Sequence, residues 1–599
     1  MVPTRSLPEA VDFLPDTWGR AQVFALSGLD GKTDCRKPFV GQTLSDRLGL
    51  LFQVSPDGAG SFRVVFGADL DGELIEGTPD TGEPGVIGPD VFSIRINLPG
   101  DSSAEFKLAW LDAQTILGRV RARNAVPCLI TSGAAYSKVV LDDEQAAVVA
   151  PRSAIQADGS QRVIRFIPGG SGKFAIIRGP GISRIAGKAM EVEFDGIFDR
   201  RMAFYRELNL PRTKDGEILK TYVKACAIMK VNVESPCGSI TNRWTTPDRW
   251  PHRYMWLWDS AFNSLGAIHL DRELGRDCIR AILAKQRSSG FIPHTLAPDP
   301  EEDSSMTQPP ILAWATWELN TTDPDRNFLA DVYPGLREYL AWDMKNMDRL
   351  QTGLLQWQFP GFDSGMDNSP RFDKGADFDA VDLNCFAANE CQALQQIAGE
   401  IGLEDEAEMW KKLREGMAEK INSRLWNGKE GFYLDRRKNG SWVKVKTVDG
   451  FLPLFAGIAP VERAKLLRKH LTDPEEFWPS FPVPSVALNE ETFELDMWRG
   501  PTWINYNWII ISGLRNYGFN GVADELEERT IGEICRWRSE RGSIYEFYDP
   551  FGKRSPQELK RKGRVRGWPD DGIPVISDFY WSSAIFVRMV IDKYGIGSG

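Results

Sequence analysis

The sequence has few histidines: four in 599 residues, at positions 252, 269, 294 and 470. No two of them have the spacing of a zinc site such as H-E-x-x-H, and no G-x-S-x-G elbow accompanies them as in a serine hydrolase. We interpret each of them as a structural or surface residue. A calcium loop of the D-x-[DN]-x-[DN]-G type is missing as well. The sequence therefore points to chemistry carried by carboxylates, with no metal and no cofactor.

Long apolar runs and cysteine pairs are also missing. Residues 1–10 contain no apolar segment, no later run reaches transmembrane length, and the eight cysteines form no C-x-x-C pair. These features predict a cytoplasmic protein with reduced thiols and no membrane partner. The net charge of −11 argues against nucleic acid as a partner. The sequence makes no prediction of the oligomeric state.

Tryptophan, by contrast, is abundant, with twenty copies in a chain that is 42% hydrophobic and 26% charged. The overall composition is ordinary for a globular protein with a large core. The tryptophan excess fits either such a core or a set of flat platforms on which sugar rings stack. In an acidic chain, we favour a small carbohydrate as the ligand.

The first 200 residues alternate between apolar and polar positions in short segments that Gly, Pro and Asp separate. Examples are residues 50–54, 61–66, 91–98 and 163–167. A period of two at this spacing is typical of an antiparallel β-sandwich. We therefore expect a β-sandwich domain at residues 1–200.

Residues 201–599 have helical periodicity instead. The expected helices are residues 217–231, 259–270, 271–286, 310–319, 326–347, 383–401, 404–425, 460–471, 503–517, 521–538 and 578–593. Helices that bury both faces, with no sequence repeat of 20 to 50 residues, favour a toroid in which an outer ring of helices wraps an inner ring. The fold class we predict is mainly α, with a helical toroid as the catalytic domain behind the sandwich.

One loop of this second part, residues 360–371, combines rigidity with charge. Two glycines and two prolines in twelve positions exclude a helix or a central strand, and the loop carries Asp363, Asp367, Asn368 and Arg371. A stiff loop can hold a carboxyl group still, as a general acid requires. The simpler explanation is turn chemistry, in which Asp367 bonds only its own backbone.

Four further loops next to helix ends carry aromatic and polar side chains: Trp256, Trp258 and Asp259; Gln308; Trp498, Arg499 and Trp503; and Tyr545 with Glu546. Each has a structural explanation, such as Asp259 acting as a helix cap. A carboxylate among aromatic rings, such as Glu546, is costly unless it is used or paired. Taken together, the five loops predict one pocket.

The order of these motifs resembles glycoside hydrolase family 63, which includes processing α-glucosidase I and the mannosylglycerate and glucosylglycerate hydrolases, with trehalase as a distant relative. The motifs are Trp256-Leu-Trp-Asp-Ser-Ala-Phe, Gln308-Pro-Pro, Ser364-Gly-Met-Asp-Asn-Ser-Pro-Arg, Trp498-Arg-Gly-Pro-Thr-Trp-Ile-Asn and Tyr545-Glu-Phe-Tyr, and they cover residues 212–595. The resemblance implies an (α/α)6 barrel and hydrolysis of an α-glycosidic bond with inversion. Inverting enzymes hold two carboxyls about 6.5–9.5 Å apart, with a water between.

The resemblance also implies a role for each residue. Asp367 matches the general acid and Glu546 the general base. Binding of the sugar would fall to Asp259, Gln308, Arg499 and Tyr545, between walls formed by Trp256, Trp258, Trp498 and Trp503, whereas Arg371 would stabilise its loop. The chain departs from the family pattern at Asp363, where relatives have Glu, and after Glu546, where Phe547 replaces Asn. These departures put the substrate in question more than the reaction.

The favoured function is therefore an exo-acting α-glucosidase on a short oligosaccharide or a small-aglycone glucoside. Mannosylglycerate, glucosylglycerate or α-rhamnoside specificity on the same barrel remains an alternative, because sequence does not distinguish sugar epimers. A glycoside phosphorylase needs a phosphate pocket in place of a second carboxylate, and the Glu546 motif argues against it. A carbohydrate-binding protein without catalysis would have no need to keep both carboxylates.

Overall fold

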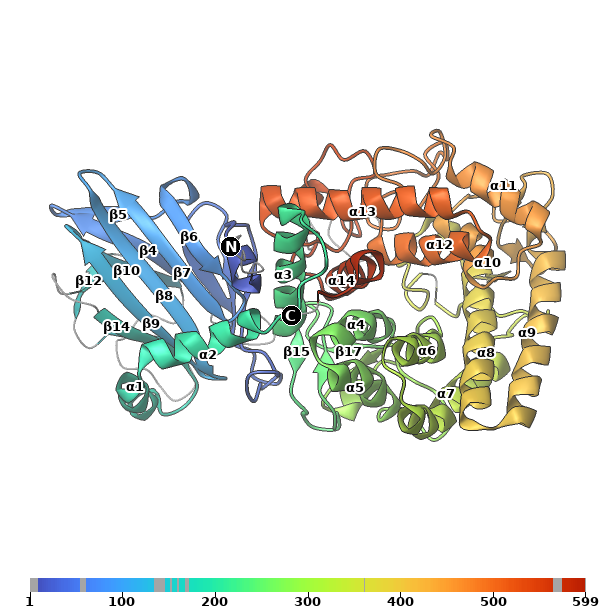
Figure 1. Cartoon of the computed structure of the whole chain (residues 1–599), viewed down its shortest axis with the longest axis horizontal. Coiled ribbons are helices and arrows are strands. Elements are labelled where there is room, and N and C mark those ends of the chain that lie inside the picture. The colour runs from blue at the N-terminus through green and yellow to red at the C-terminus, as the bar shows by residue number, and fades with distance from the viewer. Residues whose placement is uncertain are drawn as a thin grey trace, which may run out of the picture.

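The structure is a computed structural model that describes residues 9–53, 61–133, 146–150, 153–158, 161–166, 172–359, 361–563 and 574–597. Its N-terminal part consists of antiparallel sheets and its C-terminal part of helices, which lie side by side (Figure 1). None of the helices in the described ranges is both long enough and apolar enough to cross a membrane. The eight cysteines are free thiols, and most of them are buried.

Two antiparallel sheets form the N-terminal part. In the described chain the first contains β1 (Val23–Phe24), β2 (Val40–Thr43), β3 (Gly49–Gln53), β4 (Phe62–Leu70), β5 (Glu73–Glu76), β10 (Val126–Gly133), β12 (Ser153–Asp158) and β13 (Gln161–Phe166). The second contains β6 (Gly82–Ile87), β7 (Val91–Leu98), β8 (Ser102–Asp112), β9 (Thr115–Arg123), β11 (Ala146–Val149) and β14 (Gly172–Arg178).

The two sheets share one hydrophobic core. Phe66 of the first sheet contacts Phe92 and Phe106 of the second, with ring centroids 5.5 and 5.1 Å apart. Alternating apolar positions, as in β7, supply these inward-facing side chains because successive residues of a strand point to opposite faces. The sequence prediction of antiparallel strands in this part is confirmed.

Residues 182–200, which the sequence analysis included in the sandwich domain, are helical. They form α1 (Ile182–Glu191) and the first half of α2 (Phe194–Arg206). Ala186 and Ala189 of α1 pack with Ala175 and Ile177 of β14, so these helices cover the outside of the second sheet. The helices were missed because we placed the change from strand to helix periodicity near residue 200.

The C-terminal part contains α3 (Gly216–Val231), α4 (Leu257–Leu270), α5 (Arg272–Leu283), α6 (Leu312–Thr322), α7 (Arg326–Asn346), α8 (Val381–Ile401), α9 (Glu404–Arg424), α10 (Leu452–Phe455), α11 (Val461–Leu471), α12 (Ile504–Asn516), α13 (Asn520–Arg541) and α14 (Tyr580–Tyr594). Short two-stranded ladders join its loops: β15 (Val233–Glu234) with β16 (Trp244–Thr245), β17 (Met255–Trp256) with β18 (Thr295–Leu296), β19 (Phe378–Asp379) with β22 (Arg436–Arg437), and β20 (Trp426–Asn427) with β21 (Phe432–Tyr433).

Several of these helices begin at acidic caps. The Asp215 carboxylate accepts hydrogen bonds from the N–H groups of Glu217 and Ile218, and Asp325 accepts from Asn327 and Phe328. Such caps satisfy backbone donors that have no partner inside the helix and stabilise it by about 1 kcal/mol each. They explain why the helix starts were among the positions that the sequence predicted well.

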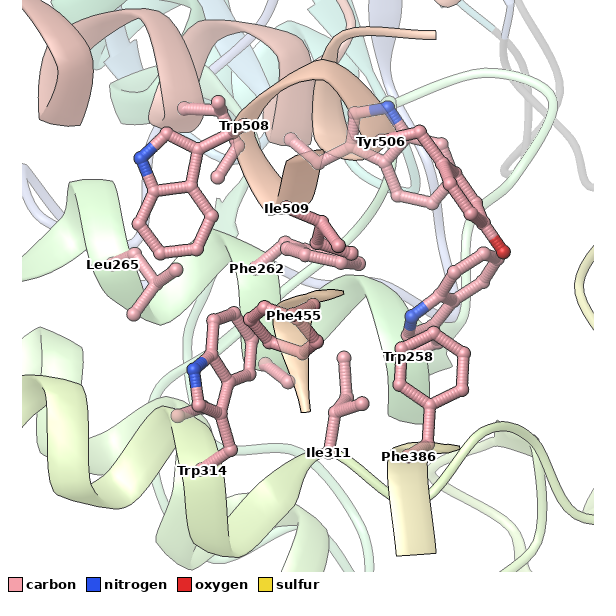
Figure 2. Packing of buried hydrophobic residues seen from close by; sticks show 14 of the residues in the cluster. Trp258, Phe262, Leu265, Ile311, Trp314, Phe386, Phe455, Tyr506, Trp508 and Ile509 are labelled. Carbon is pink, nitrogen blue, oxygen red and sulfur yellow. The ribbon is translucent and has the colours of Figure 1, made fainter. Parts of the chain in front are cut away.

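The even-numbered helices from α4 to α14 form a closed ring. α4 packs against α6, α6 against α8, and so on through α10, α12 and α14, which returns to α4. Figure 2 shows side chains from α4, α6, α8, α10 and α12 meeting inside this ring, among them Phe262, Trp314 and Phe386. The odd-numbered helices lie outside, for example α5 against α4 and α9 against α8. Aromatic side chains thus fill the centre of the ring, and a ligand site is expected among the loops.

Buried ion pairs fix the sheets against the helices. Lys230 of α3 lies 2.8 Å from Asp90 and 2.7 Å from Asp30, both of the N-terminal part. The N–H of Val23 in β1 donates to the Asp578 carboxylate over 2.7 Å. Because buried charges are costly unless they are paired, these contacts define one relative placement of the two parts.

Candidate active site

An open cavity of about 440 Å³ lies where the loops of the C-terminal part converge. Its lining residues come from stretches that are far apart in the sequence: Pro247, His252, Trp256, Trp258, Asp259, Gln308, Gly365, Asp367, Met497, Trp498, Trp503, Glu546, Arg561, Lys562, Phe579 and Trp581. Both carboxylates proposed for catalysis therefore border the same space. Of the side chains predicted to bind the sugar, Asp259, Gln308 and all four tryptophans also line it.

The loop that carries Asp367 is braced from within. Asp363 accepts hydrogen bonds from the N–H groups of Gln358 and Phe359, at 2.6 and 3.0 Å. Burial raises the pKa of Asp363 to about 7, against the opposing effect of these N–H donors. The Ser364 hydroxyl donates to the carbonyl of Gly361 and accepts from the N–H of Met366. Asp363 thus serves the conformation of the loop and lies outside the cavity lining.

The loop is also fixed to its neighbours. The Asn368 amide donates to the carbonyl of Asp496 and accepts from the N–H of Trp498, at 3.2 and 2.8 Å. Arg371 is buried and pairs with Asp382, Asp435 and Asp449, which agrees with its expected stabilising role. These contacts hold the backbone on both sides of Asp367, so its carboxyl has a defined position relative to Trp498.

Gly365 offers a stability test of this loop. Its φ is +73°, and a Cβ there would lie 2.1 Å from Cζ3 of Trp258. Gly365→Ala should therefore add an overpacking cost of about 1–3 kcal/mol to a left-handed backbone cost of about 1–2 kcal/mol. We expect a lower free energy of unfolding, measured with denaturant, and reduced turnover because Trp258 or Asp367 must move.

Gly375→Ala is the matched control for that variant. Gly375 has a similar φ of +85°, but nothing beyond its own chain neighbours lies within 4 Å of the position that a Cβ would take. It carries the backbone cost alone. Equal losses of stability in the two variants would contradict close contact between the loop and Trp258.

Glu546 lies on the segment between α13 and α14. Its N–H donates to the carbonyl of Ile576 over 3.0 Å, and two backbone hydrogen bonds between Tyr548 and Thr502 hold the segment against the loop before α12. The Glu546 carboxylate is buried and accepts two hydrogen bonds from Arg561: from Nε at 2.8 Å and from Nη2 at 3.1 Å. The cost of burying this carboxylate is thus met by a bidentate ion pair.

Asp259 is not the helix cap that we considered. α4 begins at Leu257 with Trp256 as its N-cap, so Asp259 lies within the first turn and borders the cavity. Burial raises the pKa of Asp259 well above its ordinary value, and the charges of Glu546, Asp248 and Asp367 act in the same direction. This environment favours a neutral carboxyl, which can donate a hydrogen bond to a sugar oxygen.

The aromatic walls contain unused donors. The indole rings of Trp498 and Trp503 stack with centroids 3.8 Å apart, and Trp258 lies 6.3 Å from Trp498. Among the described residues, the buried indole N–H groups of Trp256, Trp258, Trp498 and Trp581 have no hydrogen-bond acceptor.

Two of the residues predicted to bind the sugar are outside the cavity lining. Arg499 pairs with Asp373 at 2.8 and 3.0 Å and donates to the carbonyl of Asn368, so it connects two loops. Tyr545 is fully buried, and its N–H donates to the hydroxyl of Tyr548. Motif position alone does not reveal which way a side chain points, and both residues belong to the scaffold of the site in this structure.

Among the lining residues that the sequence analysis did not assign to the site, three have titratable or charged side chains: His252, Arg561 and Lys562. We had interpreted His252 as a structural or surface residue. The run of Lys560, Arg561 and Lys562 in an acidic chain was a usable signal, because basic side chains close to catalytic carboxylates have an electrostatic role. Within the described chain, no group of three or more His, Cys, Asp or Glu side chains is placed to hold a metal ion.

Comparison with known proteins places this site in a family. A family model described as "Mannosylglycerate hydrolase MGH1-like glycoside hydrolase domain" matches residues 252–558. A mannosylglycerate hydrolase from Thermus thermophilus is 28% identical, over 51% of this chain and 91% of that protein. A crystal structure of a family 63 mannosylglycerate hydrolase, from a second strain of Thermus thermophilus, is 25% identical with a TM-score of 0.51, over 61% of this chain and 99% of that one.

A bacterial glucoamylase structure is similar over a longer stretch. It covers 98% of both chains with a TM-score of 0.63 and 9% identity, which shows a shared fold alone. The family model thus covers α4 to α13 and most of the residues that line the cavity, and the glucoamylase likeness extends to the N-terminal sheets.

Proposed function

The chain belongs to glycoside hydrolase family 63 and is a glycoside hydrolase; from this premise we propose that it is an exo-acting, inverting α-glycosidase with Asp367 as general acid and Glu546 as general base. The observation that carries the proposal is that both carboxylates border one cavity, together with four tryptophans, Asp259 and Gln308.

The arrangement of the helices also supports the proposal. The closed ring of even-numbered helices, with the odd-numbered helices outside it, is the arrangement expected for an (α/α)6 barrel. We propose that the catalytic domain begins between α2 and α3, a few residues beyond position 200, because α2 packs on β8 whereas α3 packs on α13 and α14. The N-terminal sheets form the companion domain.

In the proposed reaction, the sugar lies against the tryptophans and donates and accepts hydrogen bonds at Asp259 and Gln308. Gln308 is itself held in place, because its side-chain carbonyl accepts from the N–H of Trp258 at 3.1 Å. Asp367 protonates the glycosidic oxygen while Glu546 removes a proton from a water molecule. That water attacks the anomeric carbon from the opposite face, the C–O bond breaks, and the products are the inverted sugar and the protonated aglycone.

Two substrate classes are compatible with this site. An α-glucoside with a short or small aglycone is the first. A mannosylglycerate or glucosylglycerate type of substrate is the second, and the description of the matching family model favours it. Both have a terminal pyranose ring that the cavity could take, and they differ in the aglycone.

Incubation of the purified protein with a panel of substrates tests the proposal. The panel contains maltose, an aryl α-glucoside, glucosylglycerate and mannosylglycerate, each with and without phosphate, and released monosaccharide is measured. We expect release from at least one α-glycoside without phosphate. Turnover only with phosphate would establish a phosphorylase, and binding without turnover of any α-glycoside would reject a hydrolase of this specificity.

A further inference from the structure

Arg561 and Lys562 are consecutive in the chain, and each contacts a different one of the two carboxylates. Arg561 binds Glu546 at 2.8 and 3.1 Å. The ammonium group of Lys562 lies 2.6 Å from Oδ2 of Asp367. A single short segment thus places one cation against the proposed base and one against the proposed acid.

The backbone explains how neighbours reach opposite sides of the cavity. Lys562 has a φ of +61°, a left-handed conformation that turns the chain sharply. Just before it, Lys560 forms backbone hydrogen bonds with Leu495 and Met497, at 3.2 and 3.1 Å. The segment is therefore fixed to the loop that carries Trp498, and both cations extend from a rigid base.

Arg561 is oriented by a second contact. Its Nη2 lies 3.2 Å from Nε2 of His252, and Nδ1 of His252 lies 2.5 Å from the Asp248 carboxylate. A guanidinium group only donates hydrogen bonds, so Nε2 must accept and Nδ1 must carry the proton that it donates to Asp248. Asp248, His252 and Arg561 thus form a chain of contacts that ends at Glu546.

We propose that Arg561 and Lys562 are positioning residues that set the protonation of the base and of the acid, respectively. The inference rests on the proposed function, because it needs Glu546 and Asp367 in those roles. The base must be ionised and the acid protonated at the working pH, so a neighbouring cation helps the base and opposes the acid. A cation next to each carboxylate favours its ionised form. Arg561 therefore extends activity to lower pH, and Lys562 limits it at higher pH.

Other charged groups face the same carboxylates. Asp259 lies close to both, and its pKa is raised well above the ordinary value by burial and by the neighbouring negative charges. His294 faces Asp367, and burial lowers its pKa to about 4, so it is neutral near neutral pH. Burial lowers the pKa of Arg561, but the negative charges of Glu546, Asp367 and Asp248 have the larger combined effect. The pKa of Arg561 is therefore raised above its ordinary value. Arg561 and Lys562 therefore supply positive charge that Asp259 and His294 do not.

The pH profile of kcat/KM separates the two roles. Arg561→Met should move the acidic limb to higher pH by about one unit or more, because the base loses the cation that contacts it. The alkaline limb should move by less, because Arg561 acts on Asp367 only through space. Lys562→Met should move the alkaline limb to higher pH by a similar amount and leave the acidic limb unchanged. Lys560→Met is the control: Lys560 is exposed on the same segment and outside the cavity lining, so neither limb should move.

Arg561→Lys distinguishes charge from geometry. It keeps the cation but cannot form the bidentate pair, so the acidic limb should stay close to that of the wild type while kcat falls about tenfold or more. This variant also keeps the inference testable if Arg561→Met does not fold. Circular dichroism and thermal melting identify a variant that is merely unfolded.

The outcomes are distinguishable. Lower kcat with both limbs unmoved in Arg561→Met and Lys562→Met would show a purely structural role and overturn the inference. A larger shift of the same limb in both variants would overturn the separate assignment of base and acid. Failure of the wild-type enzyme to hydrolyse any α-glycoside would instead reject the proposed function on which the inference rests.

Discussion

Replacing Asp367 by Asn should reduce kcat for an unactivated α-glycoside by about 10²- to 10⁴-fold, the range typical of a lost general acid. An amide keeps the shape of the side chain, so the loop held by Asp363, Asn368 and Arg371 should survive the change. Substrate affinity should remain measurable by calorimetry. The loss should be much smaller for an aryl glycoside whose phenolate leaves without protonation.

Asp377→Asn is the control for this variant. Asp377 lies ten residues after Asp367, but its side chain is 75% exposed and its ion pair with Arg349 is long, at 3.6 Å. Turnover should not change. Equal losses of kcat for activated and unactivated leaving groups in Asp367→Asn would contradict the role of Asp367 as the acid, because protonation matters only for poor leaving groups.

Glu546→Gln should lower kcat by a similar factor, of about 10²- to 10⁴-fold, but for every leaving group alike. The base acts on the water, so the nature of the aglycone does not compensate for its loss. The substitution also replaces one oxygen that accepts from Arg561 by a donor, which breaks the bidentate pair. Stopped assays with the same aryl glycosides as for Asp367→Asn make the comparison direct.

Glu540→Gln serves as the matched control. Glu540 lies on α13, six residues earlier, and forms a half-exposed pair with Arg536 at 3.5 Å. Such pairs contribute little to stability, and turnover should be unchanged. If Glu546→Gln retained turnover on activated substrates, Glu546 would not be the base.

The helices were predictable because they repeat an apolar stripe over many residues. Every stretch predicted as helical in the C-terminal part contains a helix, and acidic caps such as Asp325 mark starts within a residue or two. α10 was missed because four residues are too few to establish a period. α1 and α2 were missed because we placed the change from strand to helix periodicity too late in the chain.

The candidate site was only partly predictable, since sequence places loops in order but does not orient side chains. Asp367 and Glu546, which line the cavity, were singled out because their motifs resemble those of family 63. Arg499 was expected in the cavity, yet it pairs with Asp373, a partner 126 residues away that no local pattern indicates. The contacts of Arg561 with Glu546 and His252 form only in the folded chain, 15 and 309 residues apart.

The central claim is inversion by an acid and a base on opposite sides of the scissile bond. Proton NMR of an early time point, before mutarotation equalises the anomers, tests it most directly. The account predicts that the sugar released from an α-glycoside appears first as the β-anomer. First appearance of the α-anomer would demonstrate retention and contradict the assignment of Glu546 as a base that acts on water.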